Sequence, residues 1–278
     1  MAGRPDAVTG RYFTETADVL RAAGVQVVEV DGWKTRARSS GGFAAGRPWC
    51  VMWHHTASKA TPESDVSYIV NADTAPISNL LIARDGCAWV VAAGATNTNG
   101  KGGPLTLPKG TVPANCMNEY GFGMEIANDG VGEPYPQAQI DCAFACSNAL
   151  NLLFGNPPTA AVSHASWSPG RKIDPAVAWA VQGPWEPRSI NSSGTWNLDD
   201  LRAECQRRAT PAPIPTPDPE EDDVPFIIVN KDTGQPALVY DGKVTGLDGG
   251  SLATFVARYG QPITVESVTF DDFAAKGG

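Results

Sequence analysis

The sequence predicts an α/β domain, and three observations point to this fold class. Residues 50–55 and 121–127 are apolar on both faces, as strands in the centre of a sheet are. Residues 80–91 have the pattern of a β-hairpin with an Asp-Gly turn. Residues 136–154 carry polar side chains on only one narrow stripe, which predicts a helix buried over most of its circumference.

Shorter elements fill the intervals between these central ones. Helical spacing predicts amphipathic helices over residues 14–23 and 198–208. Residues 25–30 and 160–164 have the pattern of strands. Residues 65–70 fit a helical turn or a short extended segment, and the pattern leaves both open.

Composition excludes several classes of protein. Hydrophobic residues make up 42% and charged residues 18% of the 278 positions, which is typical of a globular protein. The net charge of −9 argues against nucleic acid as a partner and against electrostatic adhesion to an anionic membrane. No apolar run approaches the roughly 20 residues that span a bilayer, so membrane insertion is not expected.

The N-terminus lacks the apolar segment of a signal peptide. We therefore expect synthesis in the cytoplasm, with release by other means if the target lies outside. None of the six cysteines forms a Cys-x-x-Cys pair, so a thiolate zinc site is not expected. Free buried thiols are the expectation, although a disulfide formed after release stays open.

A linker divides the chain. Proline alternates with other residues from 211 to 219 and is followed by four acids, which predicts an extended linker over residues 210–224. Residues 1–209 precede it as the main domain. Residues 225–278 follow as a small α+β C-terminal module, with a hairpin, a helix over residues 252–259 and a strand over residues 263–268.

Residues 163–174 contain the strongest candidate site. A Pro-Gly turn in this segment lets His164 and Asp174 approach one point while Lys172 stays close by. Histidine and carboxylate ligands are those of a catalytic zinc site, which leaves one coordination position for water. Such a site needs a third protein ligand.

The chain has only three histidines, and the other two, His54 and His55, end the strand predicted over residues 50–55. Successive strand residues point to opposite faces, so the two cannot both approach one metal ion, and periodicity does not choose between them. Glu125 lies among apolar residues and glycine in another predicted strand. A carboxylate there is costly without a partner or a role. Singly, each of these residues could be structural, but together they include every histidine in the chain.

Two motifs resemble those of a known family. Trp53-His54-His55-Thr56-Ala57 and His164-(x)5-Gly170-Arg171-Lys172-x-Asp174-Pro175 resemble the zinc motifs of type 2 N-acetylmuramoyl-L-alanine amidases. This family includes phage endolysin catalytic domains, bacterial anhydromuramyl-peptide amidases and animal peptidoglycan recognition proteins. The resemblance covers roughly residues 45–180 and is greatest to actinobacteriophage endolysins, through residues 65–78 and 94–100.

The resemblance implies a mixed central β-sheet flanked by helices and one Zn²⁺ ion held by His54, His164 and Asp174. It also implies that Lys172 faces the reacting carbonyl and that Glu125 transfers protons. Some relatives place a catalytic tyrosine where this chain has Ser78, so proton transfer would depend more heavily on the glutamate.

The expected function is hydrolysis of the amide bond between N-acetylmuramic acid and L-alanine in peptidoglycan, by a monomeric phage endolysin. A non-catalytic peptidoglycan-binding protein and a zinc peptidase acting on the stem peptide are the alternatives. A long Gly- and Asn-rich loop over residues 94–115 is expected to form the substrate rim. The expected substrate contacts are Asn97, Asn99 and Trp167. Residues 225–278 are either a wall-targeting module or an oligomerisation or stability appendage.

Overall fold

The computed structural model describes residues 10–177, 183–209, 226–240, 243–246 and 263–265. The chain divides into two compact units, Met1–Pro211 and Ala212–Gly278. The linker and the helix expected over residues 252–259 lie outside the described residues. Within the described residues, no helix is long and apolar enough to cross a membrane.

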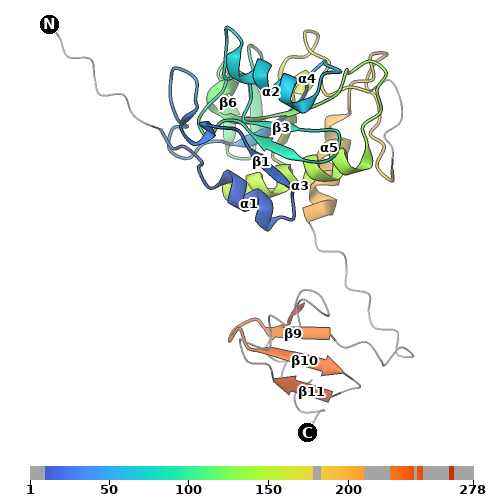
Figure 1. The fold of residues 1–278 in the computed structure, drawn as a ribbon. Coiled ribbons are helices and arrows are strands. Elements are labelled where there is room, and N and C mark those ends of the chain that lie inside the picture. The colour runs from blue at the N-terminus through green and yellow to red at the C-terminus, as the bar shows by residue number, and fades with distance from the viewer. Residues whose placement is uncertain (1–9, 178–182, 210–225, 241–242, 247–262, 266–278) are drawn as a thin grey trace, which may run out of the picture. The chain divides into compact units, whose positions relative to one another are not determined.

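A six-stranded mixed sheet is the centre of the first unit (Figure 1). All neighbouring strands pair in parallel except β3 and β4, which form the predicted antiparallel hairpin. This confirms the mixed central sheet. In spatial order the strands are β1 (Val27–Glu29), β4 (Ala88–Val90), β3 (Leu80–Ile82), β7 (Gly121–Ile126), β2 (Cys50–His55) and β8 (Ala161–Ser163).

Helices flank both faces of the sheet (Figure 1). One face carries α1 (Thr16–Ala22), α3 (Gln137–Leu153) and α5 (Leu198–Ala209), and the other carries α2 (Pro62–Asn71) and α4 (His164–Trp167). The face beneath α3 is the larger apolar core, in which Trp53, Phe122 and Phe144 are buried. Because side chains alternate along a strand, the residues of β2 and β7 that do not enter this core point toward α2 and α4.

The open choice at residues 65–70 is settled in favour of a helix. Thr61 caps α2, since its hydroxyl accepts a hydrogen bond from the Ser64 N–H, and Pro62 stands at the first helical position, where its missing N–H is no loss. The buried side of α2 consists of Asp65, Val66 and Ile69. A carboxylate therefore interrupts an otherwise apolar helix face.

The loop over residues 94–115, expected to form the substrate rim, is partly buried. It contains a small hairpin, β5 (Leu105–Leu107) and β6 (Gly110–Val112), and its first part packs against the sheet. Thr96, Thr98 and Asn99 are buried there. A side chain at Gly123 would place its Cβ 2.1 Å from the Thr98 hydroxyl, so β7 needs glycine at this position for the loop to lie on it. Two short 3₁₀ helices, Trp33–Thr35 and Met117–Glu119, were also not predicted.

The second unit contains a four-stranded sheet in the order β11-β10-β9-β12. The predicted hairpin is present as antiparallel β9 and β10, and β12 pairs in parallel with β9. The strands are β9 (Phe226–Asn230), β10 (Pro236–Tyr240), β11 (Lys243–Gly246) and β12 (Ile263–Val265).

Candidate active site

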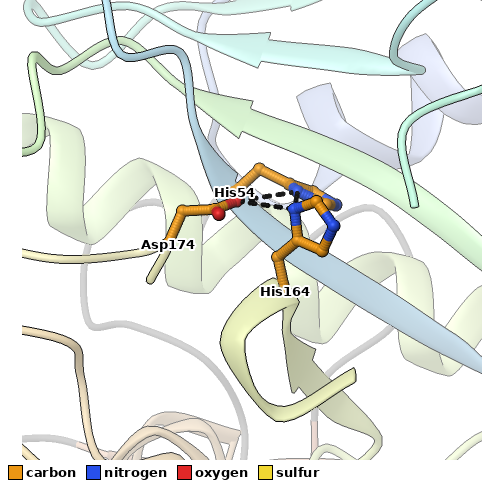
Figure 2. A group of neighbouring side chains, drawn as sticks. All are labelled: His54, His164 and Asp174. Carbon is orange, nitrogen blue, oxygen red and sulfur yellow. Dashed lines mark hydrogen bonds and ion pairs between the residues drawn. The ribbon is translucent and has the colours of Figure 1, made fainter. Parts of the chain in front are cut away.

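Two histidines and an aspartate converge at the end of β2 (Figure 2). The Nδ1 atoms of His54 and His164 lie 2.9 Å apart, and Asp174 Oδ2 lies 3.1 Å from the first and 2.9 Å from the second. All three side chains are buried, with exposed fractions of 2%, 4% and 8%.

Strand pairing brings these residues together. Trp53 of β2 pairs in parallel with Ser163 of β8, so the next residue of each strand is one of the two histidines. The Ser163 side chain caps α4 by accepting a hydrogen bond from the Ser166 N–H, which turns the chain at His164. The Ala165 N–H then donates to the carbonyl of Asp174 at 2.9 Å, which returns the loop to the site.

The three atoms fit a metal ion. Each offers a lone pair toward the same point, and so close an approach of three acceptors is unfavourable unless a cation lies among them. Tetrahedral zinc with bonds of about 2.1 Å places its ligand atoms about 3.4 Å apart, close to the separations observed. Among the described residues, this is the group of histidine, cysteine and acidic side chains able to hold an ion.

Charge at the site favours one added positive charge. Burial opposes ionisation of Asp174, but the two histidine rings beside its carboxyl hold the pKa of this group well below its usual range. Burial lowers the pKa of His164 to about 4, which keeps this ring neutral, as a metal ligand must be. At His54, Asp174 and Glu125 outweigh burial and raise the pKa. A proton on His54 or a bound metal ion would supply this positive charge.

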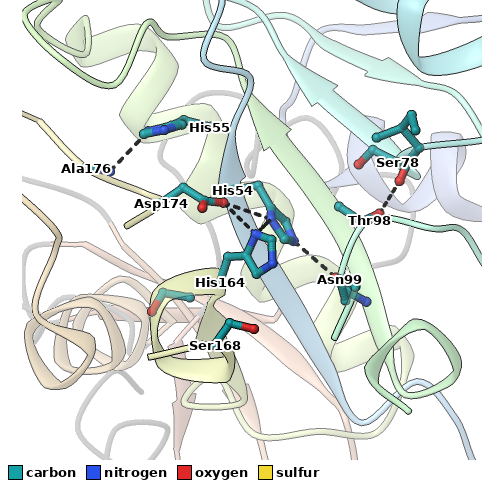
Figure 3. Close-up of polar contacts among 12 residues, drawn as sticks. His54, His55, Ser78, Thr98, Asn99, His164, Ser168, Asp174 and Ala176 are labelled. Atoms are coloured by element: carbon teal, nitrogen blue, oxygen red, sulfur yellow. Dashed lines mark hydrogen bonds and ion pairs between the residues drawn. The ribbon is translucent and has the colours of Figure 1, made fainter. Parts of the chain in front are cut away.

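Asn99 orients the first histidine (Figure 3). Its side-chain oxygen lies 3.1 Å from His54 Nε2, and its amide group donates to the carbonyls of Met117 and Gly121. With the amide nitrogen so committed, the oxygen must accept from Nε2–H, which leaves the Nδ1 lone pair for a metal ion. Asn99 is fully buried. Its role in this structure is to position His54, and the expected substrate contact stays a prediction.

Glu125 lies beside the metal-binding group. In the parallel pairing of β2 with β7, His54 stands opposite Glu125, so both side chains lie on the same face. Glu125 Oε2 is buried and has no hydrogen-bond partner in the described part of the chain. Burial raises the pKa of this carboxyl to about 7; Asp174 raises it further, while His54 and Lys172 act in the opposite direction. The group can therefore exchange a proton near neutral pH.

Lys172 is half-buried in the loop between α4 and Asp174. Its charge acts on both Glu125 and His164, so its ammonium group belongs to the same electrostatic site. The structure thus brings together all five residues for which the sequence predicts a metal-binding or catalytic role.

His55 faces away from the metal-binding group, which resolves the choice that periodicity leaves open (Figure 3). Its Nδ1 accepts a hydrogen bond from the Ala176 N–H at 3.2 Å, and the Tyr135 hydroxyl lies 3.4 Å away. Burial lowers the pKa of this ring, which keeps it neutral and able to accept. His55 therefore holds the segment that follows Asp174.

Three further expectations concern side chains near the site. Trp167 is fully buried and donates to the carbonyl of Gly100, so it packs beneath the loop, and its expected substrate contact stays a prediction. Asn97 is half-buried and donates to the carbonyl of Thr74, which ties the loop to the segment after α2. Ser78 is buried and donates to the carbonyl of Leu80, so it does not occupy a catalytic position.

A loop over residues 128–133 supports His55, and sequence reasoning missed it. Asp129 Oδ1 accepts hydrogen bonds at 2.9–3.0 Å from the N–H groups of Val131, Gly132 and Glu133, and Lys59 lies 3.1 Å from the other oxygen. A Cβ at Gly130 would lie 2.2 Å from the His55 ring. The Asp-Gly pair in the sequence signals a turn here, but not its contact with the histidine.

Comparison with known proteins gives a family match. Residues 44–177 match the family model Amidase_2, described as N-acetylmuramoyl-L-alanine amidase. A search of curated protein sequences found no match.

Three solved structures that are similar to this chain are an amidase from E. coli, an endolysin amidase and an insect protein. The E. coli N-acetylmuramyl-L-alanine amidase AmiD is 16% identical, with a TM-score of 0.39 and coverage of 64% of this chain and 79% of that one. The endolysin amidase LysCS from Clostridium intestinale is 16% identical, with a TM-score of 0.36 and coverage of 52% and 84%. Drosophila PGRP-LB is 15% identical, with a TM-score of 0.39 and coverage of 52% and 85%.

Because of the loop that supports His55, the free energy of unfolding of the first unit should decrease as the pH falls. Three backbone N–H groups, together with Lys59, hold the pKa of Asp129 well below its usual range. Below about pH 4 the unfolded chain binds this proton and the folded chain does not, so the stabilisation present at neutral pH is lost on acidification. Asp129→Asn should therefore lower the urea midpoint at pH 7, and the difference from wild type should shrink toward pH 2.5.

Tryptophan fluorescence can follow this unfolding, because all eight tryptophans precede residue 212. Asp73→Asn, at an exposed position after α2, is the matched control and should leave the midpoint unchanged. A difference between Asp129→Asn and wild type that stays constant with pH would contradict this account.

Proposed function

We propose that the chain is a zinc-dependent amidase of bacterial peptidoglycan, on the premise that residues 44–177 match the model of the N-acetylmuramoyl-L-alanine amidase family. The bond cut is the amide between the lactyl group of N-acetylmuramic acid and L-alanine. The observation that carries the proposal is the buried triangle formed by the Nδ1 atoms of His54 and His164 and by Asp174 Oδ2.

The side chains around this triangle supply the remaining chemistry. A zinc ion held there would polarise the scissile carbonyl and make water acidic enough to lose a proton near neutral pH. Glu125 accepts that proton at Oε2, which has no competing partner among the described residues, and returns it to the departing amine of L-alanine. Lys172 stabilises the oxyanion of the tetrahedral intermediate, an effect of about 3 kcal/mol for one such donor.

The geometry of the site supports two alternative functions less well than it supports an amidase. A non-catalytic peptidoglycan-binding protein has no need of a carboxylate with a pKa raised to about 7 beside a complete set of metal ligands. A zinc peptidase acting on the stem peptide would use the same groups, and the products of cleavage distinguish it.

The biological setting that we propose is that of a phage endolysin. The protein would be made in the host cytoplasm, would reach the wall after release and would act there as a monomer. The second compact unit, Ala212–Gly278, would attach the enzyme to the wall. The resemblance of the two zinc motifs to those of endolysins supports this setting, as does the division of the chain into two units.

Digestion of purified cell walls tests the reaction itself. Cleavage of the proposed bond releases new L-alanine amino termini and leaves muramic acid with a free lactyl carboxylate. Amino-terminal labelling with mass spectrometry of the products should show both. New termini at other residues of the stem peptide would mean that the enzyme is a peptidase, and new reducing sugar ends would mean that it is a glycosidase.

Two substitutions should separate metal binding from proton transfer. His164→Ala removes a ligand and should abolish both zinc binding and hydrolysis. Glu125→Gln keeps the shape of the side chain and should retain one zinc ion per chain while kcat falls a hundredfold or more. Metal content by mass spectrometry and turnover on soluble muramoyl-peptide provide the two readouts. Turnover close to wild type in Glu125→Gln would exclude this carboxylate as the proton carrier.

Deletion of residues 210–278 tests the role of the second unit. The truncated chain should hydrolyse soluble muramoyl-peptide at the wild-type rate but pellet less with insoluble walls. Comparing binding at 4 °C with hydrolysis keeps the two properties separate. A different result would be unchanged wall binding, with light scattering giving fewer chains per particle for the truncated protein than for the full-length one. That result would show that this unit is an oligomerisation element instead.

A further inference from the structure

Asp174 is the one residue of the metal-binding triangle that lies outside a helix or strand. His54 stands in β2 and His164 begins α4, whereas Asp174 ends the irregular loop that follows α4. Its neighbour in that loop, Ile173, is exposed. Before the ligand, the chain is held where the Ala165 N–H donates to the Asp174 carbonyl at 2.9 Å. The position of the carboxylate therefore depends also on what holds the chain after it.

Tyr135 and His55 hold the backbone two residues after this ligand. The Tyr135 hydroxyl donates to the Ala176 carbonyl at 3.1 Å, and His55 Nδ1 accepts from the Ala176 N–H at 3.2 Å (Figure 3). The hydroxyl also lies 3.4 Å from His55 Nδ1, so the two side chains are neighbours. Together they bind both hydrogen-bonding groups of one backbone residue.

The ring of Tyr135 supports the next residue toward the ligand. It packs edge-to-face against Trp196, with ring centroids 4.8 Å apart, and the Trp196 N–H donates to the Pro175 carbonyl at 3.0 Å. Tyr135 itself is fully buried in the apolar core beneath α3. A side chain in this place does not touch a substrate, so its effect on the site passes through the segment after Asp174.

A fixed backbone beside Asp174 matters because zinc tolerates little displacement of its ligands. Its bonds to carboxylate oxygen and to histidine nitrogen all lie within about 2.0–2.2 Å. Groups that orient the ligands from behind commonly change metal affinity by roughly 10- to 100-fold when they are removed. A loop that could shift by a fraction of a bond length would hold the carboxylate less precisely and bind the ion less tightly.

We propose that Tyr135 is a positioning residue for the metal centre, which acts with His55 on the backbone of Ala176 and thereby sets the affinity of the triangle for zinc. The inference rests on the proposed function, since that function places zinc in the triangle. It adds a role for a tyrosine that lies in the core and takes no part in the proposed reaction.

The zinc affinity of the full-length chain, measured by competition with a chromophoric chelator, tests the role of the hydroxyl. Tyr135→Phe keeps the ring against Trp196 and should weaken zinc binding by about tenfold. Tyr12→Phe is the matched control and should leave the affinity at its wild-type value. Tyr12 packs against the same core, and its hydroxyl makes no hydrogen bond within the described part of the chain.

Unfolding of the metal-free chains in urea distinguishes positioning from a purely structural role. A lower urea midpoint in Tyr135→Phe together with unchanged zinc affinity would mean that the hydroxyl serves folding alone, and the proposal would be overturned.

Two substitutions at His55 test the other half of the contact. Asparagine places its side-chain oxygen where the histidine ring has Nδ1, so His55→Asn keeps an acceptor for the Ala176 N–H and should retain zinc affinity close to wild type. His55→Leu has a similar size but no acceptor, and should weaken zinc binding by about tenfold. Equal affinities in the two variants would contradict a role for this hydrogen bond.

The zinc measurement separates this inference from the proposed function. If the wild type binds zinc but does not cleave muramoyl-peptide, the amidase proposal fails, and weaker zinc binding in Tyr135→Phe still supports the positioning role. If the wild type binds zinc and cleaves, while Tyr135→Phe and His55→Leu both keep wild-type affinity, the amidase proposal stands and this inference fails.

Discussion

Parallel pairing of β2 with a strand on each side is the constraint on which the site depends. Pairing with β7 sets His54 opposite Glu125, and pairing with β8 brings His164 to the same end of the sheet. Because strand side chains alternate, this register also decides that His54 and not His55 faces the site. A slip of one residue in the pairing with β7 would separate His54 from Glu125, and a slip in the pairing with β8 would separate His54 from His164.

Around this register, hydrogen bonds to neighbouring segments hold each group in one orientation. Asn99 fixes the tautomer of His54, and His55 holds the segment after Asp174 through the Ala176 N–H. Neither residue touches the reacting atoms. Both act by restricting the ligands to the geometry in which three lone pairs meet, and such positioning commonly affects metal affinity as strongly as a change of ligand.

The two sides of the site differ in charge and in burial. Lys172 supplies the positive side, while Glu125 and Asp65 supply oxygens that lack hydrogen-bond partners within the described structure. The acidic character of the chain as a whole therefore says little about the polarity of the site.

The sequence by itself determined the α/β class, the hairpin, the long helix α3 and the approach of His164 to Asp174. These followed from patterns local to a segment, such as apolar strands and the Pro-Gly turn. The choice of His54 over His55 came from the family resemblance and from the strand register. Tertiary structure alone decided the rest. Asn99 is a polar residue in a Gly-rich loop and Trp167 is an amphipathic residue just before a Pro-Gly turn, and both patterns favour exposure. Packing of the loop against β7 and α4 nevertheless buries both. Their burial depends on contacts far apart in the chain, and no local pattern encodes such contacts.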